Sequence, residues 1–234
     1  ANTLSYNWVI PNTPSNNVKV RISDAANSAI RDVSDSTFVI ANVTVLSPNG
    51  GERWQSGSAK QITWSNTSNV SLVNLYYSTN NGTSWNSIVL NQTASTGSYN
   101  WTVPATPSQQ TLVKVVDANS SGAISDSSDA VFTISSLSIV APIGGENWLG
   151  GSTQAIRWTN SSDVNLVDIY YSTNNGTSWT SIVTNQSTVG GQYNWSVPVN
   201  INTSTAKVKI EYSTDVTVSA SSGTFSIYYP NLVL

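Results

Sequence analysis

The chain has 234 residues, no Cys, Met or His, 9% charged residues and a formal net charge of −3 at pH 7. The missing residue types exclude disulfides, thiolate and imidazole metal ligands, and catalytic arrangements of Ser or Cys with His. No basic excess is present and no apolar run approaches the roughly 20 residues of a membrane span, so we expect no nucleic-acid partner, no direct membrane insertion and no enzyme activity.

Residues 1–40 are expected to be the C-terminal half of a repeat. Tyr6-Asn-Trp8 and Phe38 align with Tyr99-Asn-Trp101 and Phe132, which belong to a full repeat later in the chain. Half of a β unit cannot bury its own apolar face. We therefore expect either a longer parent chain or a neighbouring molecule to supply the missing strands.

Residues 41–134 are expected to form a full β unit. Apolar and polar side chains alternate with period two along short segments, and Gly, Pro and Asn separate these segments. The inward-facing candidates are Ile62, Trp64, Val73, Leu75, Tyr77, Tyr99, Trp101, Val103, Val113, Val115, Phe132 and Ile134.

Residues 135–227 repeat this unit. The motif at 48–54 returns at 142–148, an offset of 94 residues, and every Trp after position 8 falls into the same register. Tyr76 and Tyr170 lie on the outward phase, whereas nearly all other Trp and Tyr residues are predicted to face inward. The inward-facing candidates of this unit are Ile156, Trp158, Val167, Ile169, Tyr171, Tyr193, Trp195, Val197, Val208, Ile210, Phe225 and Ile227.

About seven short strands in a unit of this length are typical of an immunoglobulin or fibronectin-type sandwich. The expected fold class is therefore all-β, with tandem immunoglobulin/fibronectin-III-like β-sandwiches. Residues 228–234 follow the second unit, and Asn231-Leu-Val-Leu234 falls where the next repeat would open. We expect this segment to be either that first strand or a donor strand for another subunit.

The motifs shared by the two full units resemble those of a known family. They read Pro-x-Gly-Gly-Glu-x-Trp, Ile-x-Trp, Tyr-Tyr-Ser-x-Asn-Asn-Gly-x-Ser-Trp and Tyr-Asn-Trp-x-Val-Pro. This run resembles the Ser/Thr-rich, GPI-anchored membrane family related to the yeast cell-wall-synthesis domain. The resemblance implies β-sandwich modules repeated in large surface or secreted proteins, and it implies no catalytic residues.

Two eight-residue segments, 78–85 and 172–179, also resemble the Asp-box of sialidases, with Asn80 and Asn174 at the Asp position. The Asn-Gly pair at the tip of each segment suits the positive backbone angles of a tight turn. We therefore expect this box to stabilise a hairpin rather than to bind glycan.

Acidic pairs before the last strand of a unit are the candidates for a metal site. Carboxylates spaced by a turn can converge on Ca²⁺, whereas the alternative is a polar turn in which Asp caps backbone amides. These candidates are Asp32, Asp35, Asp126 and Asp129. No other cofactor is expected.

Glu52 and Glu146 follow Gly-Gly at the same turn of the two units. A glycosidase needs two facing carboxylates, and no second acid repeats near these residues. We expect each of them to make a structural hydrogen bond or an ion pair with Lys60 or Arg157.

Twelve Asn-x-Ser/Thr sequons occur, which is a modest excess in a chain so rich in Asn and Ser. In a host that glycosylates secreted proteins, sugars on several of them would give a hydrated coat in place of surface charge. The candidates are Asn42, Asn66, Asn69, Asn81, Asn91, Asn100, Asn119, Asn160, Asn175, Asn185, Asn194 and Asn202.

The leading functional hypothesis is a structural protein that is secreted or displayed at the cell surface, such as a stalk, sheath or filament subunit. Its incomplete sandwiches are expected to associate with identical subunits or neighbouring repeats, head to tail, by strand complementation. The alternative is a glycan-binding or adhesive accessory module of a larger secreted protein, with polysaccharide as its partner.

Overall fold

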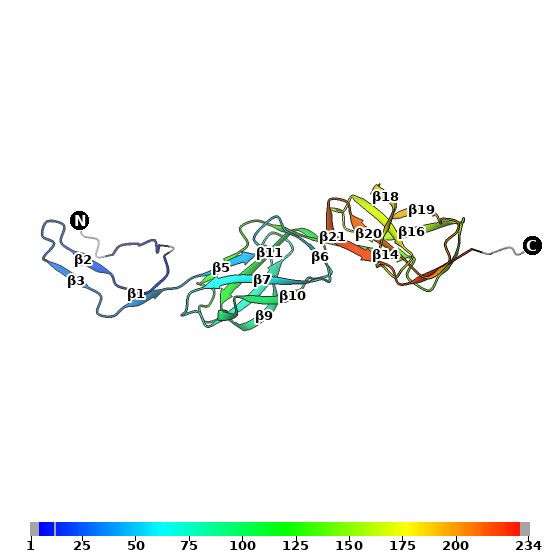
Figure 1. Ribbon diagram of the computed structural model, residues 1–234. Coiled ribbons are helices and arrows are strands. Elements are labelled where there is room, and N and C mark those ends of the chain that lie inside the picture. The colour runs from blue at the N-terminus through cyan, green and yellow to red at the C-terminus, as the bar shows by residue number, and fades with distance from the viewer. Residues whose placement is uncertain (1–4, 12, 230–234) are drawn as a thin grey trace, which may run out of the picture. The chain divides into compact units, whose positions relative to one another are not determined.

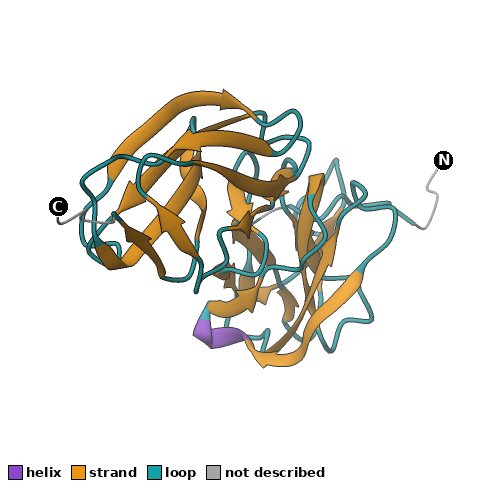
Figure 2. Cartoon of the chain, turned by 90° about the vertical axis from the view of Figure 1, so that its right-hand side faces the viewer, coloured by secondary structure: helices purple, strands orange, loops and turns teal. Residues whose placement is uncertain are grey.

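A computed structural model describes residues 5–11 and 13–229. Within this part the chain consists of strands and loops, and its one helical element is a 3₁₀ turn at Ala94–Thr96 (Figure 2). None of the described residues form a helix long and apolar enough to cross a bilayer. They divide into two compact units, one with residues up to 50, 61–101 and 111–131, the other with residues 51–60, 102–110 and from 132 onward.

The described residues up to 40, which we call the leading segment, contain four short strands that form two antiparallel pairs (Figure 1). β1 (Ser15–Val18) pairs with β4 (Phe38–Ile40), and β2 (Arg21–Ser23) pairs with β3 (Arg31–Val33). This arrangement matches the second half of the repeats that follow.

The first full repeat contributes two sheets, one ordered β10-β7-β5 and one ordered β6-β13-β11-β8-β9, with β12 paired to β11. β6 and β13 run parallel, whereas the pairs β5–β7, β8–β9, β8–β11 and β11–β12 are antiparallel. The strands are β5 (Val43–Ser47), β6 (Arg53–Gln55), β7 (Ala59–Asn66), β8 (Leu72–Ser78), β9 (Asn86–Thr93), β10 (Ser98–Thr102), β11 (Ser108–Asp117), β12 (Ser125–Ser127) and β13 (Phe132–Ser135).

The second full repeat has the same topology, with sheets ordered β14-β16-β19 and β15-β22-β20-β17-β18, and with β21 paired to β20. Its buried side chains form one continuous apolar core. The strands are β14 (Leu137–Ala141), β15 (Asn147–Leu149), β16 (Thr153–Asn160), β17 (Leu166–Ser172), β18 (Thr180–Ser187), β19 (Gln192–Ser196), β20 (Thr203–Tyr212), β21 (Asp215–Ser221) and β22 (Phe225–Tyr228).

The predicted fold class is confirmed, because the chain is all-β and contains two β-sandwich domains of the immunoglobulin/fibronectin-III type. The period-two alternation also places the core correctly. Every aliphatic, Trp and Phe residue predicted to face inward is buried, and the four Tyr residues predicted there are half-buried at the edge of the core. Of residues 228–234, the structure describes Tyr228, at the end of β22, and Tyr229, and the expected strand at 231–234 lies outside the described residues.

The prediction that nearly all Trp residues face inward is wrong for Trp85 and Trp179. Both rings are half-exposed and lie in the turn before β9 or β18, where strand alternation does not apply. Each ring faces a lysine ammonium, at 4.2 Å from Lys114 Nζ and 5.3 Å from Lys209 Nζ. The core of a full repeat therefore contains three Trp side chains rather than four.

Candidate functional site

The leading segment reproduces the local structure of a full repeat. Ile22 lies opposite Asp32 in the β2–β3 pair, as Val115 lies opposite Asp126 in the β11–β12 pair. The same equivalence holds at the other ends of these strands, where the Ser34 amide donates to the Val20 carbonyl at 2.9 Å. These matched registers make Ile22 the structural equivalent of Val115.

The β1–β4 pair of the leading segment also has a counterpart. Val18 lies opposite Phe38, just as Ala206 lies opposite Phe225 in the second repeat. In both pairs the register shifts within the three residues before this position, between Ser15 and Val18 or between Thr203 and Ala206. Residues 15–40 therefore contain strand pairs with the registers found in the second half of a full repeat.

Three of the side chains that would form the core of this half, Trp8, Val20 and Ile22, are exposed, and Val18 and Phe38 are half-buried. Ile22 is 73% exposed, whereas its equivalent Val115 is fully buried. Trp8 is 45% exposed, whereas its equivalents Trp101 and Trp195 are 7% and 4% exposed. We call the surface formed by Trp8, Val18, Val20, Ile22 and Phe38 the leading face.

In a full repeat, an opening strand lies beside the hairpin that corresponds to β2–β3. β5 lies next to β12, and the Val45 amide donates a hydrogen bond of 2.8 Å to Asp126 Oδ2. Asp32 is the equivalent carboxylate in the leading segment and is exposed. The leading segment therefore has an acceptor in position for the amide of an opening strand.

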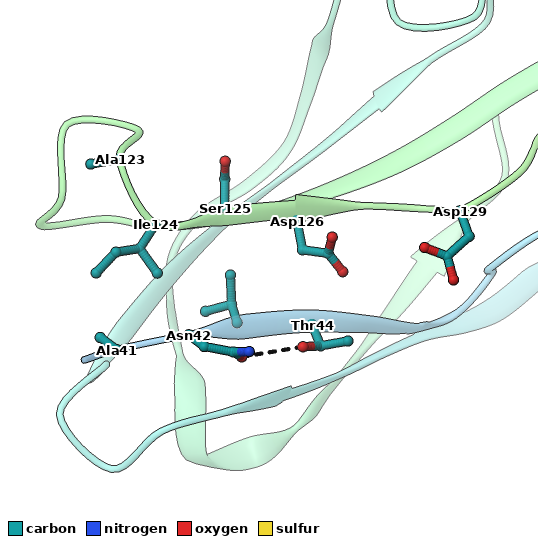
Figure 3. Close-up of a pocket in the computed structure, with 9 residues that line it drawn as sticks. Ala41, Asn42, Thr44, Ala123, Ile124, Ser125, Asp126 and Asp129 are labelled. Carbon is teal, nitrogen blue, oxygen red and sulfur yellow. Dashed lines mark hydrogen bonds between the residues drawn. The ribbon is translucent and has the colours of Figure 1, made fainter. Parts of the chain in front are cut away.

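The predicted Ca²⁺ ligands of the first full repeat line one open pocket of about 400 Å³ between residues 41–44 and 123–129 (Figure 3). Asp126 is bonded to the β5 backbone, and Asp129 Oδ2 accepts a hydrogen bond of 2.7 Å from Asn49 Nδ2. Asp126 thus connects β12 to the opening strand β5, and Asp129 connects the turn after β12 to the loop after β5. No group of three or more Asp, Glu, His or Cys side chains within the described ranges could hold a metal ion, so Ca²⁺ binding by Asp32, Asp35, Asp126 and Asp129 stays a prediction.

Each Asp-box-like segment is a closed network of side-chain and backbone hydrogen bonds. The buried Ser78 hydroxyl donates to Asn80 Oδ1 at 2.8 Å and accepts from the Gly82 amide at 2.9 Å. Asn80 Oδ1 also accepts from the Ser84 amide at 3.0 Å. The same bonds recur in the second repeat, and they use the polar groups to hold the turn.

Glu146 binds the turn in which it lies. Its two carboxylate oxygens accept hydrogen bonds from the amides of Ile143 at 2.7 Å and Gly144 at 2.9 Å. Of the two expected alternatives, Glu146 therefore makes the structural hydrogen bond, whereas Arg157 Nε donates to Gln192 Oε1. A local amide pair satisfies both oxygens without a distant cation.

In the second repeat, Glu211 lies beside Lys209. Lys209 Nζ lies 2.7 Å from Glu211 Oε2 and 4.7 Å from the ring centroid of Tyr170. Burial, reinforced by the negative charge of Glu211, raises the pKa of the Tyr170 hydroxyl. In the first repeat, Lys114 takes the corresponding place over Tyr76 and Trp85, beside an open pocket of about 340 Å³.

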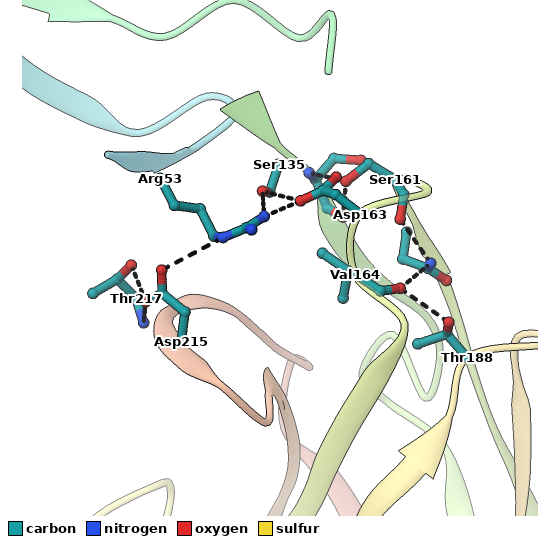
Figure 4. Close-up of polar contacts among 10 residues, drawn as sticks. Arg53, Ser135, Ser161, Asp163, Val164, Thr188, Asp215 and Thr217 are labelled. Carbon is teal, nitrogen blue, oxygen red and sulfur yellow. Dashed lines mark hydrogen bonds and ion pairs between the residues drawn. The ribbon is translucent and has the colours of Figure 1, made fainter. Parts of the chain in front are cut away.

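A polar cluster that the sequence did not reveal lies within the second compact unit (Figure 4). Arg53 Nη1 on β6 pairs with Asp163 Oδ2 and donates to Ser135 Oγ at 2.7 Å, while its Nε lies 3.7 Å from Asp215 Oδ2. The guanidinium also lies 5.1 Å from the ring centroid of Tyr212. We call this set of residues the Arg53 cluster.

The sequence contains one indication of the Arg53 cluster, because Arg53 and Asp163 are two positions at which the repeats differ in charge. At the positions of Arg53 and Asp163, the other repeat has Asn147 and Asn69. Opposite charges that each occur in one repeat are natural partners, but their separation of 110 residues hides the pairing in the sequence. Gln55 belongs to the same neighbourhood, because its side-chain amide exchanges two hydrogen bonds with the Ser219 backbone.

The twelve candidate sequon residues fall into two classes. Asn42, Asn66 and Asn160 are half-buried, and the other nine are exposed. Asn66 Nδ2 donates to the carbonyls of residues 67 and 70, and Asn160 Nδ2 donates to those of residues 161 and 164. The exposed sequon residues are Asn69, Asn81, Asn91, Asn100, Asn119, Asn175, Asn185, Asn194 and Asn202.

Comparison with known proteins gives similarity of fold. No protein-family model matches the chain, and no curated protein matches it. Among solved structures it is similar to the fibronectin(III)-like modules of Clostridium thermocellum CbhA, with 20% identity, 80% of this chain and 92% of that chain covered, and a TM-score of 0.29.

Two further similar structures contain tandem extracellular or Ig modules. Extracellular domains 3-5 of Drosophila OTK are 10% identical over 86% of this chain and 67% of that chain, with a TM-score of 0.36. The tandem Ig repeats of Dlar are 13% identical over 82% of this chain and 99% of that chain, with a TM-score of 0.26. At these identities the likeness concerns the fold alone.

Proposed function

We propose that this chain is a structural repeat element of a secreted or cell-surface protein, acting as a stalk, sheath or filament subunit without catalytic activity. Tandem sandwiches of this type are common in cell-surface proteins. The motifs that resemble the Ser/Thr-rich, GPI-anchored family point the same way.

The observation that supports self-association is the leading face. Its strands already have the register of a full repeat, yet Ile22 and Trp8 are exposed where their equivalents are core. Burying a large apolar side chain stabilises a complex by about 1.5–3 kcal/mol. We infer that strands of a second copy of this chain cover the leading face, head to tail, and that an amide of the donated strand binds Asp32.

The apolar sequence at 231–234 is the proposed donor, because it matches the opening strand of a repeat in position and in alternation. Such strand addition combines main-chain hydrogen bonds with side-chain pockets, which gives both affinity and register. Repetition of one heterologous contact of this kind builds an open chain of subunits.

Sedimentation velocity of the 234-residue chain over a wide concentration range tests the proposal. We expect larger species to grow with concentration, and Ile22→Asp to abolish them because a carboxylate would have to be buried. Val189→Asp is the matched control, since Val189 is 88% exposed in a loop outside the leading face. A wild-type chain that stays monomeric throughout, or association that survives Ile22→Asp, would refute the proposal.

The alternative of a glycan-binding accessory module is supported by one feature. Tyr76 is partly exposed and lines the pocket of about 340 Å³, and the partly exposed Trp85 lies against Lys114, which lines the same pocket. Aromatic rings of this kind can stack on sugars. Titration with polysaccharides, comparing wild type with Tyr76→Ala, separates this alternative from the structural role.

A further inference from the structure

Each full repeat has an edge strand, β9 or β18, that lacks the charged residues and prolines that protect such strands from pairing. β9 and β18 are the last strands of their sheets, so one side of each strand has no neighbouring strand among the described residues. Each is eight residues long, and neither contains a charged residue or a proline. Edge strands without charge, proline or cover are sites of unwanted pairing between molecules.

A sequon lies within each of these edge strands, at a bulge. Asn91 and Asn185 adopt left-handed backbone angles, with φ of 56° and 53°. Their backbone amides are held by the side chains of residues 74 and 168, at 2.8 Å and 2.7 Å. Both asparagines are exposed, and so are the hydroxyl residues Thr93 and Ser187 that complete the sequons.

Asn66 and Asn160 have the same sequon pattern but a different structural role. The Asn160 side-chain nitrogen donates to the carbonyls of Ser161 at 3.0 Å and Val164 at 2.7 Å, which uses both of its hydrogens. Asn66 repeats this with the carbonyls of Thr67 and Val70, at 3.0 Å and 3.2 Å. An N-glycosidic bond replaces one of those hydrogens, so at least one of the two turn bonds would be lost.

We propose that N-linked glycans at Asn91 and Asn185 cover the free edges of the two sandwiches, whereas Asn66 and Asn160 stay unmodified in the folded protein. The linkage forms between Nδ2 and the anomeric carbon of a sugar carried on an activated lipid donor. Nδ2 loses one proton, and the lipid-linked phosphate leaves. A hydrated sugar at the bulge blocks the approach of another strand and supplies the protection that charged residues give elsewhere.

The proposal is tested by measuring the glycan occupancy of each sequon asparagine in the chain after secretion from a eukaryotic host that performs N-glycosylation. Peptide-N-glycosidase in water labelled with a heavy oxygen isotope converts each glycosylated Asn to Asp that carries the heavy oxygen, which mass spectrometry of the peptides then locates. We expect high occupancy at Asn91 and Asn185 and near-zero occupancy at Asn66 and Asn160. Empty edge sites, or occupied Asn66 or Asn160 in protein with an unchanged melting temperature, would overturn it.

Matched sequon knock-outs provide the control. Ser187→Ala is expected to remove one glycan from the intact mass, whereas Ser162→Ala, which breaks the Asn160 sequon without altering that asparagine, is expected to remove none. A mass loss in Ser162→Ala, or none in Ser187→Ala, contradicts the assignment.

The protective role has a separate readout. In an Ile22→Asp background, which disables the leading face, Thr93→Ala/Ser187→Ala is expected to show concentration-dependent association that the glycosylated parent lacks. The absence of concentration-dependent association in the knock-out would refute the edge-covering role. Because the leading face is disabled in both proteins, this outcome is independent of head-to-tail assembly.

Discussion

Truncation of Trp195 to Ala, compared with truncation of Trp8, tests whether the buried indole contributes more to stability than its exposed equivalent near the start of the chain. Trp195 is 4% exposed, and its ring centroid lies 5.1 Å from Tyr171 and 6.0 Å from Trp148. Truncation of a buried Trp to Ala costs about 3–5 kcal/mol, because transfer free energy is lost and a cavity forms. We expect Trp195→Ala to cost about 4 kcal/mol of unfolding free energy.

Trp8→Ala is the matched comparison. Trp8 is 45% exposed, and its ring centroid lies 6.2 Å from that of Phe38. Since much of this indole already lies in water, its truncation should cost less than about 1.5 kcal/mol in the dilute chain.

Calorimetry and urea denaturation followed by circular dichroism measure both changes. For a domain of this size, 4 kcal/mol corresponds to a fall in melting temperature of roughly 16–32 °C for the transition of the second sandwich. Equal losses in Trp195→Ala and Trp8→Ala would refute the reasoning, because the two positions would then have the same surroundings.

Substitutions test three further contacts, each by equilibrium denaturation. Asn160→Asp removes both donors to the turn carbonyls and should cost about 1–3 kcal/mol, whereas Asn194→Asp, on an exposed strand face, should change stability by less than about 0.5 kcal/mol. Arg53→Ala leaves a carboxylate with a side chain 5% exposed without its cation and should also cost about 1–3 kcal/mol, and no loss would remove the Arg53 cluster as a stabilising contact. Gly223→Ala would place a Cβ 2.5 Å from the Ile143 carbonyl oxygen and should cost about 1–3 kcal/mol through a backbone shift, so an unchanged midpoint would contradict that close approach.

Much of the fold could be predicted because a strand with one buried face has a period of two. Ile156 and Trp158 alternate with polar neighbours, and so do Val167 and Ile169, and all four are buried. Internal repetition then extends each assignment to its equivalent. The same comparison predicts that residues 1–40 are half of a sandwich.

The sequence pattern does not predict the positions of side chains that lie outside strands or that depend on contacts between distant residues. Trp85 precedes β9 in a turn, so alternation could not place its ring. For Glu146 the sequence left a hydrogen bond and an ion pair open, and two backbone amides within three residues decide for the hydrogen bond. The pairing of Arg53 with Asp163 required tertiary structure, because neither residue repeats and 110 positions separate them.

The candidate sites show a similar division. A sequon pattern marks Asn66 and Asn91 alike, because it records residue types and says nothing about which hydrogens of Nδ2 are already used. Hydrogen bonding to nearby carbonyls separates the two classes, and this depends on how the chain turns after β7 and β16.

A single cysteine at position 22 gives the most direct measurement of the central claim, since the chain has no other cysteine. The labelling rate of Ile22→Cys with a maleimide should be high in dilute protein and should fall strongly at concentrations where the chain assembles, whereas Val189→Cys should label at one rate throughout. Equal labelling of position 22 in the dilute and the assembled protein would show that no donated strand covers the leading face.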